Sequence, residues 1–198
     1  MFFRANIKEV NTSLYTIEGV LSQPEFQQLY DEFCLDYNHL RVKKNANDSS
    51  TQLPRLGLRK PFPSGTGYSF NGNDMLGDNL ALINLGSKIK LISQKILKRN
   101  LSLNRINTNI QYPGIESTFH QDGAEGTWTF IIFANSHWST EWGGEFVYSG
   151  EDEYFYVPVI PNNGCLFAAH RDHRGAAPNC LANTYRQTIA FSMNEMCK

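Results

Sequence analysis

The chain has 198 residues and a formal net charge of −1, from 18 Lys and Arg against 19 Asp and Glu, and 41% of its residues are hydrophobic. This length predicts one globular domain, since domains average about 150 residues. The near balance of charge argues against strong binding to nucleic acid, whose phosphates attract basic proteins. The longest apolar runs, such as 130–134, are far shorter than the roughly 20 residues of a membrane span, so we expect no membrane partner.

Two features favour a cytoplasmic protein. Polar and charged residues interrupt the first ten positions before the apolar core of a signal peptide can form. The cysteines show neither a C-x-x-C motif nor a regular spacing; they are Cys34, Cys165, Cys180 and Cys197. We therefore expect reduced thiols rather than disulfides or a zinc site.

Residues 1–100 predict a supporting region of helices and strands. A strand is expected at 13–20. Ser22 and Glu25 then have the spacing of a capping box, in which a hydroxyl and a carboxylate bond to free amides at the start of a helix. Apolar residues recur at helical spacing from there to about residue 37, and again at 79–99, where a second helix is expected.

Two segments between these helices lack such periodicity. Residues 38–60 gather six Lys and Arg against one Asp, and are interpreted as a solvated loop or as a basic rim that receives an anionic substrate. Residues 61–78 are rich in Gly, Pro, Ser and Asn but carry three aromatic residues. This mixture favours an ordered loop, such as a lid, over a linker.

In the second half of the chain the hydrophobic period changes to two. Short strands separated by turn residues are expected at 106–112, 127–135, 144–148, 153–160, 164–169 and 185–193. Such strands favour a sandwich or a jelly-roll barrel over a parallel sheet. The sequence predicts a mainly β chain of the α+β class: a single domain, 1–198, whose β-barrel core at 101–198 is buttressed by the helices of 1–100.

Histidines and a carboxylate in this β-rich half have the spacing of a metal site. His120 and Asp122 are two residues apart, so in an extended strand both project to the same side. His173, 51 residues after Asp122, could supply a third ligand from another strand. Two His and one carboxylate leave one face of a metal open, which is the facial triad of non-haem Fe(II) oxygenases. His170 is an alternative to His173, because the His-x-Asp pattern recurs at 170–172.

Arg186 and Thr188 start the last expected strand and share one of its faces. A planar guanidinium can grip a carboxylate with two parallel charge-assisted bonds, and a threonine hydroxyl can add a third. We therefore expect an anion anchor next to the metal site.

The order of these motifs resembles the catalytic core of the Fe(II)/2-oxoglutarate-dependent dioxygenases, in particular the prolyl 4-hydroxylase-like branch. The resemblance covers 105–193, somewhat under half of the chain. The motifs that carry it are Gln111-Tyr112-Pro113-Gly114, His120-Gln121-Asp122, Trp142-Gly143-Gly144-Glu145-Phe146, Gly164-Cys165-Leu166-Phe167, His173-Arg174-Gly175 and Arg186-Gln187-Thr188. Each piece is short, but the ordered set is specific.

This resemblance implies a double-stranded β-helix in which His120, Asp122 and His173 hold Fe(II). In the family pattern the last ligand follows a buried Phe by about six residues and precedes a Pro, which selects His173 over His170. His170 would then be a neighbour that orients the ligand.

The resemblance also implies the contacts with co-substrates. Arg186 would bind the distal carboxylate of 2-oxoglutarate, assisted by Thr188. Tyr112, eight residues before His120, matches a family tyrosine that reaches the same co-substrate, although this spacing is shorter than in the family pattern. Thr129 is a further candidate on the following strand. O2 would be the second co-substrate, and ascorbate an optional reductant.

The implied activity is hydroxylation of a C–H bond with release of succinate and CO2. Loop aromatic residues suit a proline-containing peptide as substrate, and a free amino acid or other small metabolite is compatible as well. The residues expected to line such a groove are Tyr68, Phe70, His137, Trp138 and Trp142. Those available for a water-poor pocket are Phe119, Trp128, Phe130 and Phe133.

Two other readings of the sequence stay open. One is a noncatalytic jelly-roll or cupin binding module with structural histidines. The other is a cupin-type enzyme with another metal, or a zinc hydrolase, in which Arg186 would have no role. Either a monomer or a dimer is compatible with the sequence.

Overall fold

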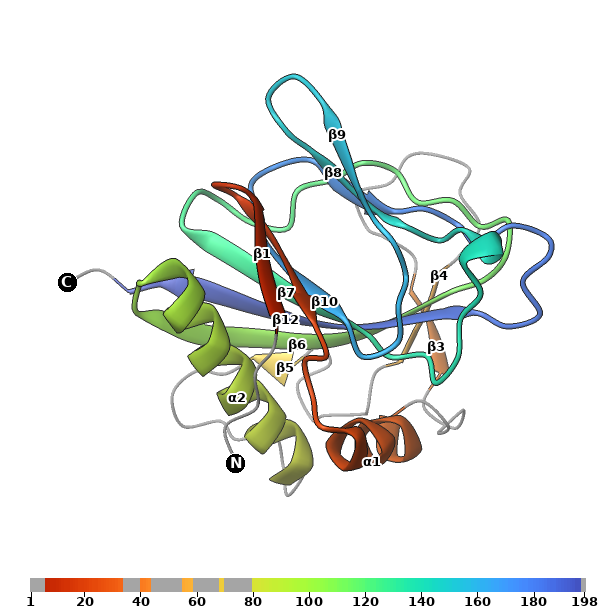
Figure 1. Ribbon diagram of the computed structural model, residues 1–198, viewed down its shortest axis with the longest axis horizontal. Coiled ribbons are helices and arrows are strands. Elements are labelled where there is room, and N and C mark those ends of the chain that lie inside the picture. The colour runs from red at the N-terminus through yellow and green to blue at the C-terminus, as the bar shows by residue number, and fades with distance from the viewer. Residues whose placement is uncertain (1–5, 34–39, 44–54, 59–67, 70–79, 197–198) are drawn as a thin grey trace.

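The computed structural model describes residues 6–33, 40–43, 55–58, 68–69 and 80–196. In this part of the chain two sheets and two α-helices form the regular structure (Figure 1), which confirms the predicted mainly β class with flanking helices. The helices are α1 (Gln23–Phe33) and α2 (Leu80–Leu97). The strands are β1 (Asn6–Asn11), β2 (Leu14–Glu18), β3 (Leu40–Lys43), β4 (Arg55–Leu58), β5 (Tyr68–Ser69), β6 (Leu101–Gln111), β7 (Thr127–Phe133), β8 (Phe146–Ser149), β9 (Tyr154–Val157), β10 (Gly164–Ala168), β11 (His173–Gly175) and β12 (Arg186–Glu195).

The large sheet has nine strands among the described residues, in the order β1-β2-β10-β7-β12-β6-β4-β3, with β5 beside β6. All of its pairings are antiparallel. Strand β12 is central, since it pairs with β6 along its whole length and with β7 over 188–194. The first hundred residues therefore supply strands to the same sheet as the barrel core.

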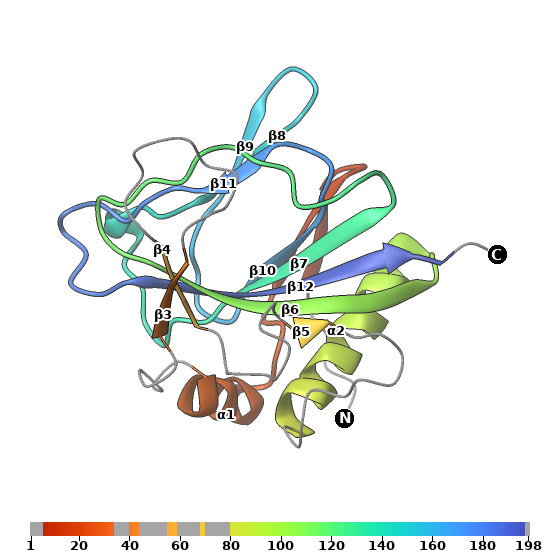
Figure 2. The ribbon, with the colours of Figure 1, turned by 180° about the vertical axis from the view of Figure 1, so that it is seen from behind.

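The small sheet has the order β11-β8-β9 and lies on the side of the large sheet away from the helices (Figures 1 and 2). A bridge between His120 and His173 adds the segment around residue 120 to its β11 edge. The large and small sheets thus face each other and enclose the interior of the barrel.

Strand β7 shows that the large sheet is buried on both faces. Trp128, Phe130 and Ile132 belong to the core cluster that includes the helices, whereas Ile131 and Phe133 belong to the cluster between the two sheets. Successive side chains of a strand point to opposite faces, so both rows are apolar. The prediction that Trp128 and Phe130 line a water-poor pocket is therefore wrong, because both point away from the barrel interior. Of the three pocket residues predicted on β7, Phe133 alone points into the barrel.

Helices α1 and α2 cover the outer face of the large sheet (Figure 1). Phe26 and Leu29 of α1 and Leu85 and Ile89 of α2 are buried in the cluster with strand residues. The helical spacing predicted for Phe26, Leu29 and Ile89 is confirmed, and Leu85 joins this buried face without having been predicted.

The start of α1 follows the predicted capping pattern in part. Glu25 accepts hydrogen bonds from the backbone amide of Ser22 at 2.8 Å and from its hydroxyl at 2.6 Å. The hydroxyl thus donates to the carboxylate, whereas the capping box would have it accept from a helix amide. Lys88 Nζ lies 2.8 Å from the same carboxylate, so Glu25 also ties α1 to α2.

The segments 38–60 and 61–78 and the four cysteines are described only in part. The described parts of 38–60 form strands β3 and β4, because β4 pairs with both β3 and β6. The side chains of the basic rim, and the expected lid at 61–78 apart from the backbone of β5, lie outside the described residues. Cys165 and Cys180 are free thiols, as predicted, and the other two cysteines lie outside the described ranges.

Among the described residues, no helix combines the length and the apolar composition that crossing a membrane requires.

Candidate metal centre and anion site

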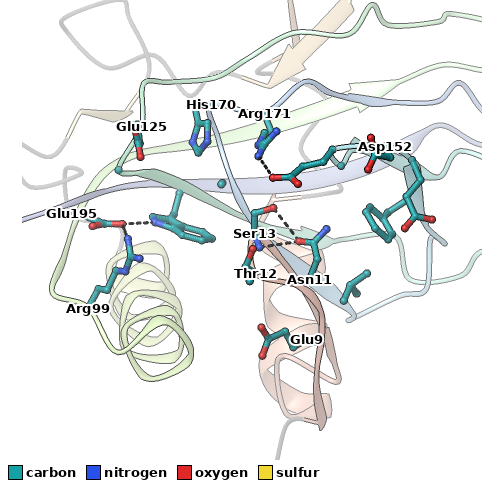
Figure 3. A pocket seen from close by; sticks show the side chains of 18 residues that line it. Glu9, Asn11, Thr12, Ser13, Arg99, Glu125, Asp152, His170, Arg171 and Glu195 are labelled. Carbon is teal, nitrogen blue, oxygen red and sulfur yellow. Dashed lines mark hydrogen bonds and ion pairs between the residues drawn. The ribbon is translucent and has the colours of Figure 1, made fainter.

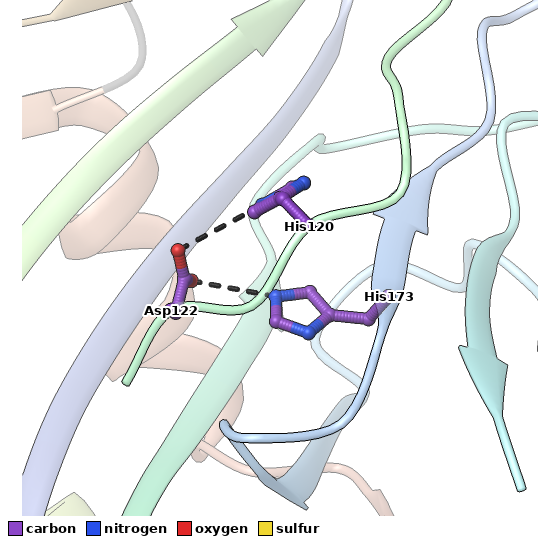
Figure 4. Close-up of side chains that lie close together, drawn as sticks. All are labelled: His120, Asp122 and His173. Atoms are coloured by element: carbon purple, nitrogen blue, oxygen red, sulfur yellow. Dashed lines mark ion pairs between the residues drawn. The ribbon is translucent and has the colours of Figure 1, made fainter. Parts of the chain in front are cut away.

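The structure brings His120, Asp122 and His173 together (Figure 4). One potential ligand atom from each residue lies within 4.8 Å of the other two. Asp122 Oδ1 is 3.7 Å from His120 Nε2, and Asp122 Oδ2 is 3.4 Å from His173 Nε2. The three residues are the one group of this kind found in the described part of the chain.

Backbone pairing holds these three residues in register. The amide of His120 donates to the carbonyl of His173 at 3.0 Å, and the amide of His173 donates to the carbonyl of His120 at 3.0 Å. The amide of Asp122 donates to the carbonyl of Ala169 at 2.9 Å. Ligands that are 51 residues apart in the sequence thus become neighbours.

Hydrogen bonds orient both imidazole rings. His120 Nδ1 lies 3.0 Å from the carbonyl oxygen of Thr118, and His173 Nδ1 lies 2.8 Å from that of Arg171. A carbonyl can only accept, so we assign the proton to each Nδ1, which leaves each Nε2 directed at Asp122. In this arrangement a metal ion would take the place of a second proton between imidazole and carboxylate.

The environment keeps the Asp122 carboxylate ionised. Burial by itself would raise its pKa, but the hydrogen bond with His173 and the charges of His173, His120 and Arg105 lower the pKa to about 2. An ionised oxygen ligand and two imidazoles suit Fe(II), and they suit Zn²⁺ as well.

His173, and not His170, joins this cluster. His173 is buried, and its ring packs 4.6 Å from that of Phe167 and 5.7 Å from that of Phe146. His170 instead lines a separate cavity of about 670 Å³, near Glu125 and Arg171 (Figure 3).

Arg186 lies at the start of β12 and points into the barrel. It is opposite Gln111 of β6, and its guanidinium carbon is 5.6 Å from the ring centroid of Phe133. The residue is 5% exposed, and its Nε has no hydrogen-bond partner. Burial lowers the pKa of Arg186 to about 10, with Cys165 and Glu145 acting in the opposite direction. The side chain therefore stays cationic at neutral pH in a place where an anion would compensate its charge.

Two glycines leave space around this guanidinium. A Cβ on Gly175 would lie 2.8 Å from Arg186 Nη1 and 2.9 Å from Gln111 Oε1. A Cβ on Gly144 would lie 3.2 Å from the Trp138 ring and 3.4 Å from Arg186 Cδ. Arg186 Nε is thus buried and unpartnered, and the absence of side chains at Gly144 and Gly175 leaves space beside the guanidinium. This arrangement fits the carboxylate of a keto acid.

The two predicted threonines both face the barrel interior. Thr188 is buried, on the same face of β12 as Arg186, and pairs with Asn109 and Phe133. Thr129 is 2% exposed, and its hydroxyl has no hydrogen-bond partner. Thr188 is two residues from Arg186 on this strand, whereas Thr129 pairs with Ser192, six residues after Arg186 along β12.

Tyr112 lies beside Tyr185 just after β6, and its contact with the co-substrate stays a prediction. Its ring contacts that of Tyr185 at 5.7 Å, and the residue opposite Arg186 is its neighbour Gln111. Gln111 Nε2 donates to the carbonyls of Ile115 and Gly175, which holds the end of β6 against β11. Gln111 was not predicted as a site residue, although the alternation along β6 could have indicated it.

Several solved structures are similar to this chain in fold. The chain is similar to a Trichoplax adhaerens prolyl hydroxylase in complex with a hypoxia inducible factor oxygen degradation domain peptide fragment, with a TM-score of 0.70, 14% identity, and 93% of this chain and 84% of that chain covered. It is similar to a Pseudomonas putida prolyl-4-hydroxylase, with a TM-score of 0.67, 11% identity and 93% of each chain covered. It is also similar to the epimerase SnoN in complex with Fe3+, alpha ketoglutarate and nogalamycin RO, with a TM-score of 0.64, 12% identity, and 92% of this chain and 78% of that chain covered.

The chain has the double-stranded β-helix fold of the 2-oxoglutarate/Fe(II) oxygenases. No protein-family model matches its sequence, and no curated protein sequence matches it significantly. At 11% to 14% identity the likeness concerns the fold, so the chemistry has to be argued from the residues of this chain.

Proposed function

We propose that this protein is an Fe(II)- and 2-oxoglutarate-dependent dioxygenase that hydroxylates a C–H bond of its substrate. The observation that carries the proposal is the presence, in one barrel, of a His-Asp-His cluster and a buried guanidinium with an unpartnered Nε. The cluster alone would also suit a zinc hydrolase. A buried cation facing a glycine-lined cradle favours a bound keto acid and hence the oxygenase.

The chain's own residues divide the work of binding. His120, Asp122 and His173 are the residues that would hold the metal. Arg186 grips the distal carboxylate of 2-oxoglutarate, and the Thr188 hydroxyl donates to it. When bound, Fe(II) supplies the activation of O2, so that 2-oxoglutarate and O2 give succinate, CO2 and one oxygen atom that enters the substrate as a hydroxyl.

Apolar side chains around the cluster exclude water from the reaction. Phe146 and Phe167 pack on His173, and Ile131 and Phe133 lie on the floor of the barrel. Low polarity around Arg186 also strengthens its bond to the keto acid, because a carboxylate and a guanidinium attract each other more strongly when desolvated.

The first substrate class to test is a peptidyl proline, with a small metabolite as the second. One neighbour in fold holds a peptide fragment. In this chain the rings of His137, Trp138 and Trp142 pack together, and Trp138 lies beside Gly144 near Arg186. Trp138 is buried, so the exposed His137 and the half-buried Trp142 present the aromatic surface, and aromatic surfaces recognise proline-containing peptides.

Anaerobic titration tests the proposal. Adding Fe(II) and then 2-oxoglutarate should produce the visible charge-transfer band of a chelated keto acid, and Arg186→Ala should abolish it at 2-oxoglutarate concentrations that saturate the wild type. Arg99→Gln, at an exposed arginine paired with Glu195, is the matched control and should keep the band. A wild type that binds Fe(II) without ever giving the band would contradict the proposal.

The choice of His173 over His170 has its own test. His173→Ala should lose Fe(II) binding, whereas His170→Ala should retain it within about threefold, because the imidazole of His170 belongs to the other cavity. Isothermal titration under anaerobic conditions measures both. The reverse result would assign the ligand to His170.

We infer that the protein works in the cytoplasm. Fe(II) and the free thiol of Cys165 are both suited to a reducing compartment. Fractionation of cells that express the full chain should recover it with soluble cytoplasmic markers, and recovery in an oxidising compartment would contradict this inference.

A further inference from the structure

A row of four paired residues, here called the rung, crosses the floor of the barrel near the metal cluster; it consists of Arg105, Ser192, Thr129 and Phe167. Ser192 of β12 pairs with Arg105 of β6 on one side and with Thr129 of β7 on the other. Thr129 in turn pairs with Phe167 of β10. Paired residues of neighbouring strands share a face, so all four side chains belong to the face that carries Phe167 into the barrel.

This rung lies next to the metal ligands. The ring of Phe167 is 4.6 Å from that of His173. At the other end of the rung, Arg105 is three strands away from Phe167, across β7 and β12. The rung therefore begins beside His173 and extends across the floor of the barrel.

Arg186 occupies a different part of the barrel. It precedes Ser192 by six residues on β12, which corresponds to about 20 Å of extended strand. Its charge acts on Cys165 and Glu145, whereas that of Arg105 acts on Asp122. Among the described residues, Arg105 and Arg186 thus occupy separate positions along the large sheet, and the proposed function uses Arg186 alone.

The Thr129 hydroxyl is a second observation that indicates a ligand at the rung. It is buried, faces the interior, and has no hydrogen-bond partner. Ser192, its partner in the sheet, is 8% exposed. Two buried hydroxyls on the same rung as an arginine offer the kinds of donor that a carboxylate uses.

We propose that Arg105, Ser192 and Thr129 form a subsite for a carboxylate of the substrate, so that the enzyme acts on a carboxylate-bearing molecule. This inference rests on the proposed oxygenase function. Arg105 forms the charge-assisted bonds and the two hydroxyls complete the anion's contacts. Because the rung begins beside His173, a carbon a few bonds from the bound carboxylate stands at the reacting centre.

Matched acids and amides test the subsite. The anaerobic protein with Fe(II) and 2-oxoglutarate is mixed with free amino acids and C4 to C6 aliphatic acids, each beside its carboxamide. Proline-containing peptides with Asp or with Asn form a second set. Binding is measured as a shift of Tm, and turnover in air as succinate formation above the background rate. We expect each acid to bind at least tenfold more tightly than its amide. A response to the free amino acids and aliphatic acids would indicate that the substrate is a free acid. A response to the Asp-containing peptides would indicate an acidic peptide.

Variants assign the effect to Arg105. Arg105→Gln should raise the Kd of the preferred acid at least tenfold and remove the preference over its amide, while Arg105→Lys should recover part of it. The charge-transfer band and the affinity for 2-oxoglutarate should stay within threefold of wild type in both. Arg99→Gln is the control, because Arg99 follows α2, is exposed, and lies over the ring of Trp128 in the cluster on the helix side of the sheet.

Two results would overturn the inference. Acids and amides that bind equally well, with a normal band, would exclude the carboxylate subsite and leave the proposed function intact. The carboxylate subsite would also be excluded, and the proposed function left intact, if Arg105→Gln weakened 2-oxoglutarate binding as much as acid binding, because Arg105 would then bind the co-substrate. A wild type without the band would instead remove the oxygenase function itself.

Discussion

Gly175 lies where β11 passes the guanidinium of Arg186. Any side chain there would meet Arg186 Nη1 at 2.8 Å and Gln111 Oε1 at 2.9 Å. Contacts under 3.0 Å force something to move, and Gln111 is already held by two carbonyls. The guanidinium is therefore the group that has to shift.

Gly175→Ala should weaken 2-oxoglutarate binding with little loss of fold. We expect the Kd for 2-oxoglutarate to rise about tenfold, which corresponds to about 1.4 kcal/mol, and Fe(II) binding to be retained. Anaerobic titration of the charge-transfer band measures both quantities. Gly126→Ala is the control: it strains a residue at φ +83° but meets no atom closer than 3.9 Å, so it should lower Tm without changing the Kd.

At the scale of single elements, the start of α1 depends on one carboxylate. Glu25 accepts two hydrogen bonds from Ser22 and forms an ion pair with Lys88. Burial by itself would raise the pKa of Glu25, but these contacts lower it from 4.5 to about 2. A depressed pKa means that the folded state binds this proton less readily than the unfolded state does. The stabilisation is therefore complete above about pH 4.5 and is lost as the pH falls toward 2.

Glu25→Gln should lower the free energy of unfolding by about 0.5 to 1 kcal/mol at pH 7, since the side chain is half-exposed and the ion pair is screened. The difference between variant and wild type should shrink between pH 5 and pH 3. Urea unfolding at several pH values measures it. A difference that stays constant over this range would show that Glu25 does not titrate as the contacts require.

Helix α2 stabilises the fold by burying apolar side chains against the large sheet. Ile89 is fully buried in the cluster between the helices and the large sheet, away from the barrel interior. Ile89→Ala should therefore cost about 2 to 4 kcal/mol of unfolding free energy, for lost burial and the cavity left behind. The affinity for 2-oxoglutarate, measured in the same preparation, should stay unchanged; a parallel loss would mean that the outer cluster also sets the site geometry.

At the scale of the whole molecule, the two halves of the chain share one sheet. Strand β2 pairs with β10, and β4 pairs with β6. Ile17 and Val20 from the first half are fully buried together with Phe130 and Phe191 from the second. The predicted division into a support region and a barrel core thus separates strands that lie side by side.

A fragment of residues 101–198 should not fold alone. Without the first hundred residues it would expose the outer face of β7 and β12 and leave the β10 edge unpaired, which favours aggregation. Circular dichroism and a urea titration of the fragment should show no cooperative transition. A cooperative transition would mean that the barrel core is an independent domain.

Much of the chemistry was readable from the sequence, because it depends on residue type and local spacing. His120 and Asp122 are two residues apart, and the alternation of a strand is enough to place them on one side. Arg186 and Thr188 follow the same rule, and the apolar spacing of α1 and α2 predicted their buried faces. These features need only a local backbone conformation, which the sequence alone determines.

Only the tertiary structure decided which distant segments meet. It paired residue 120 with β11, a strand of three residues that leaves no periodic signal, and so brought His173, which the resemblance had selected over His170, to Asp122. It placed Gln111 rather than Tyr112 opposite Arg186, and it turned Phe130 outward on a strand that is apolar on both faces. Such outcomes depend on the register between strands far apart in the chain, where a shift of one residue reverses every side chain.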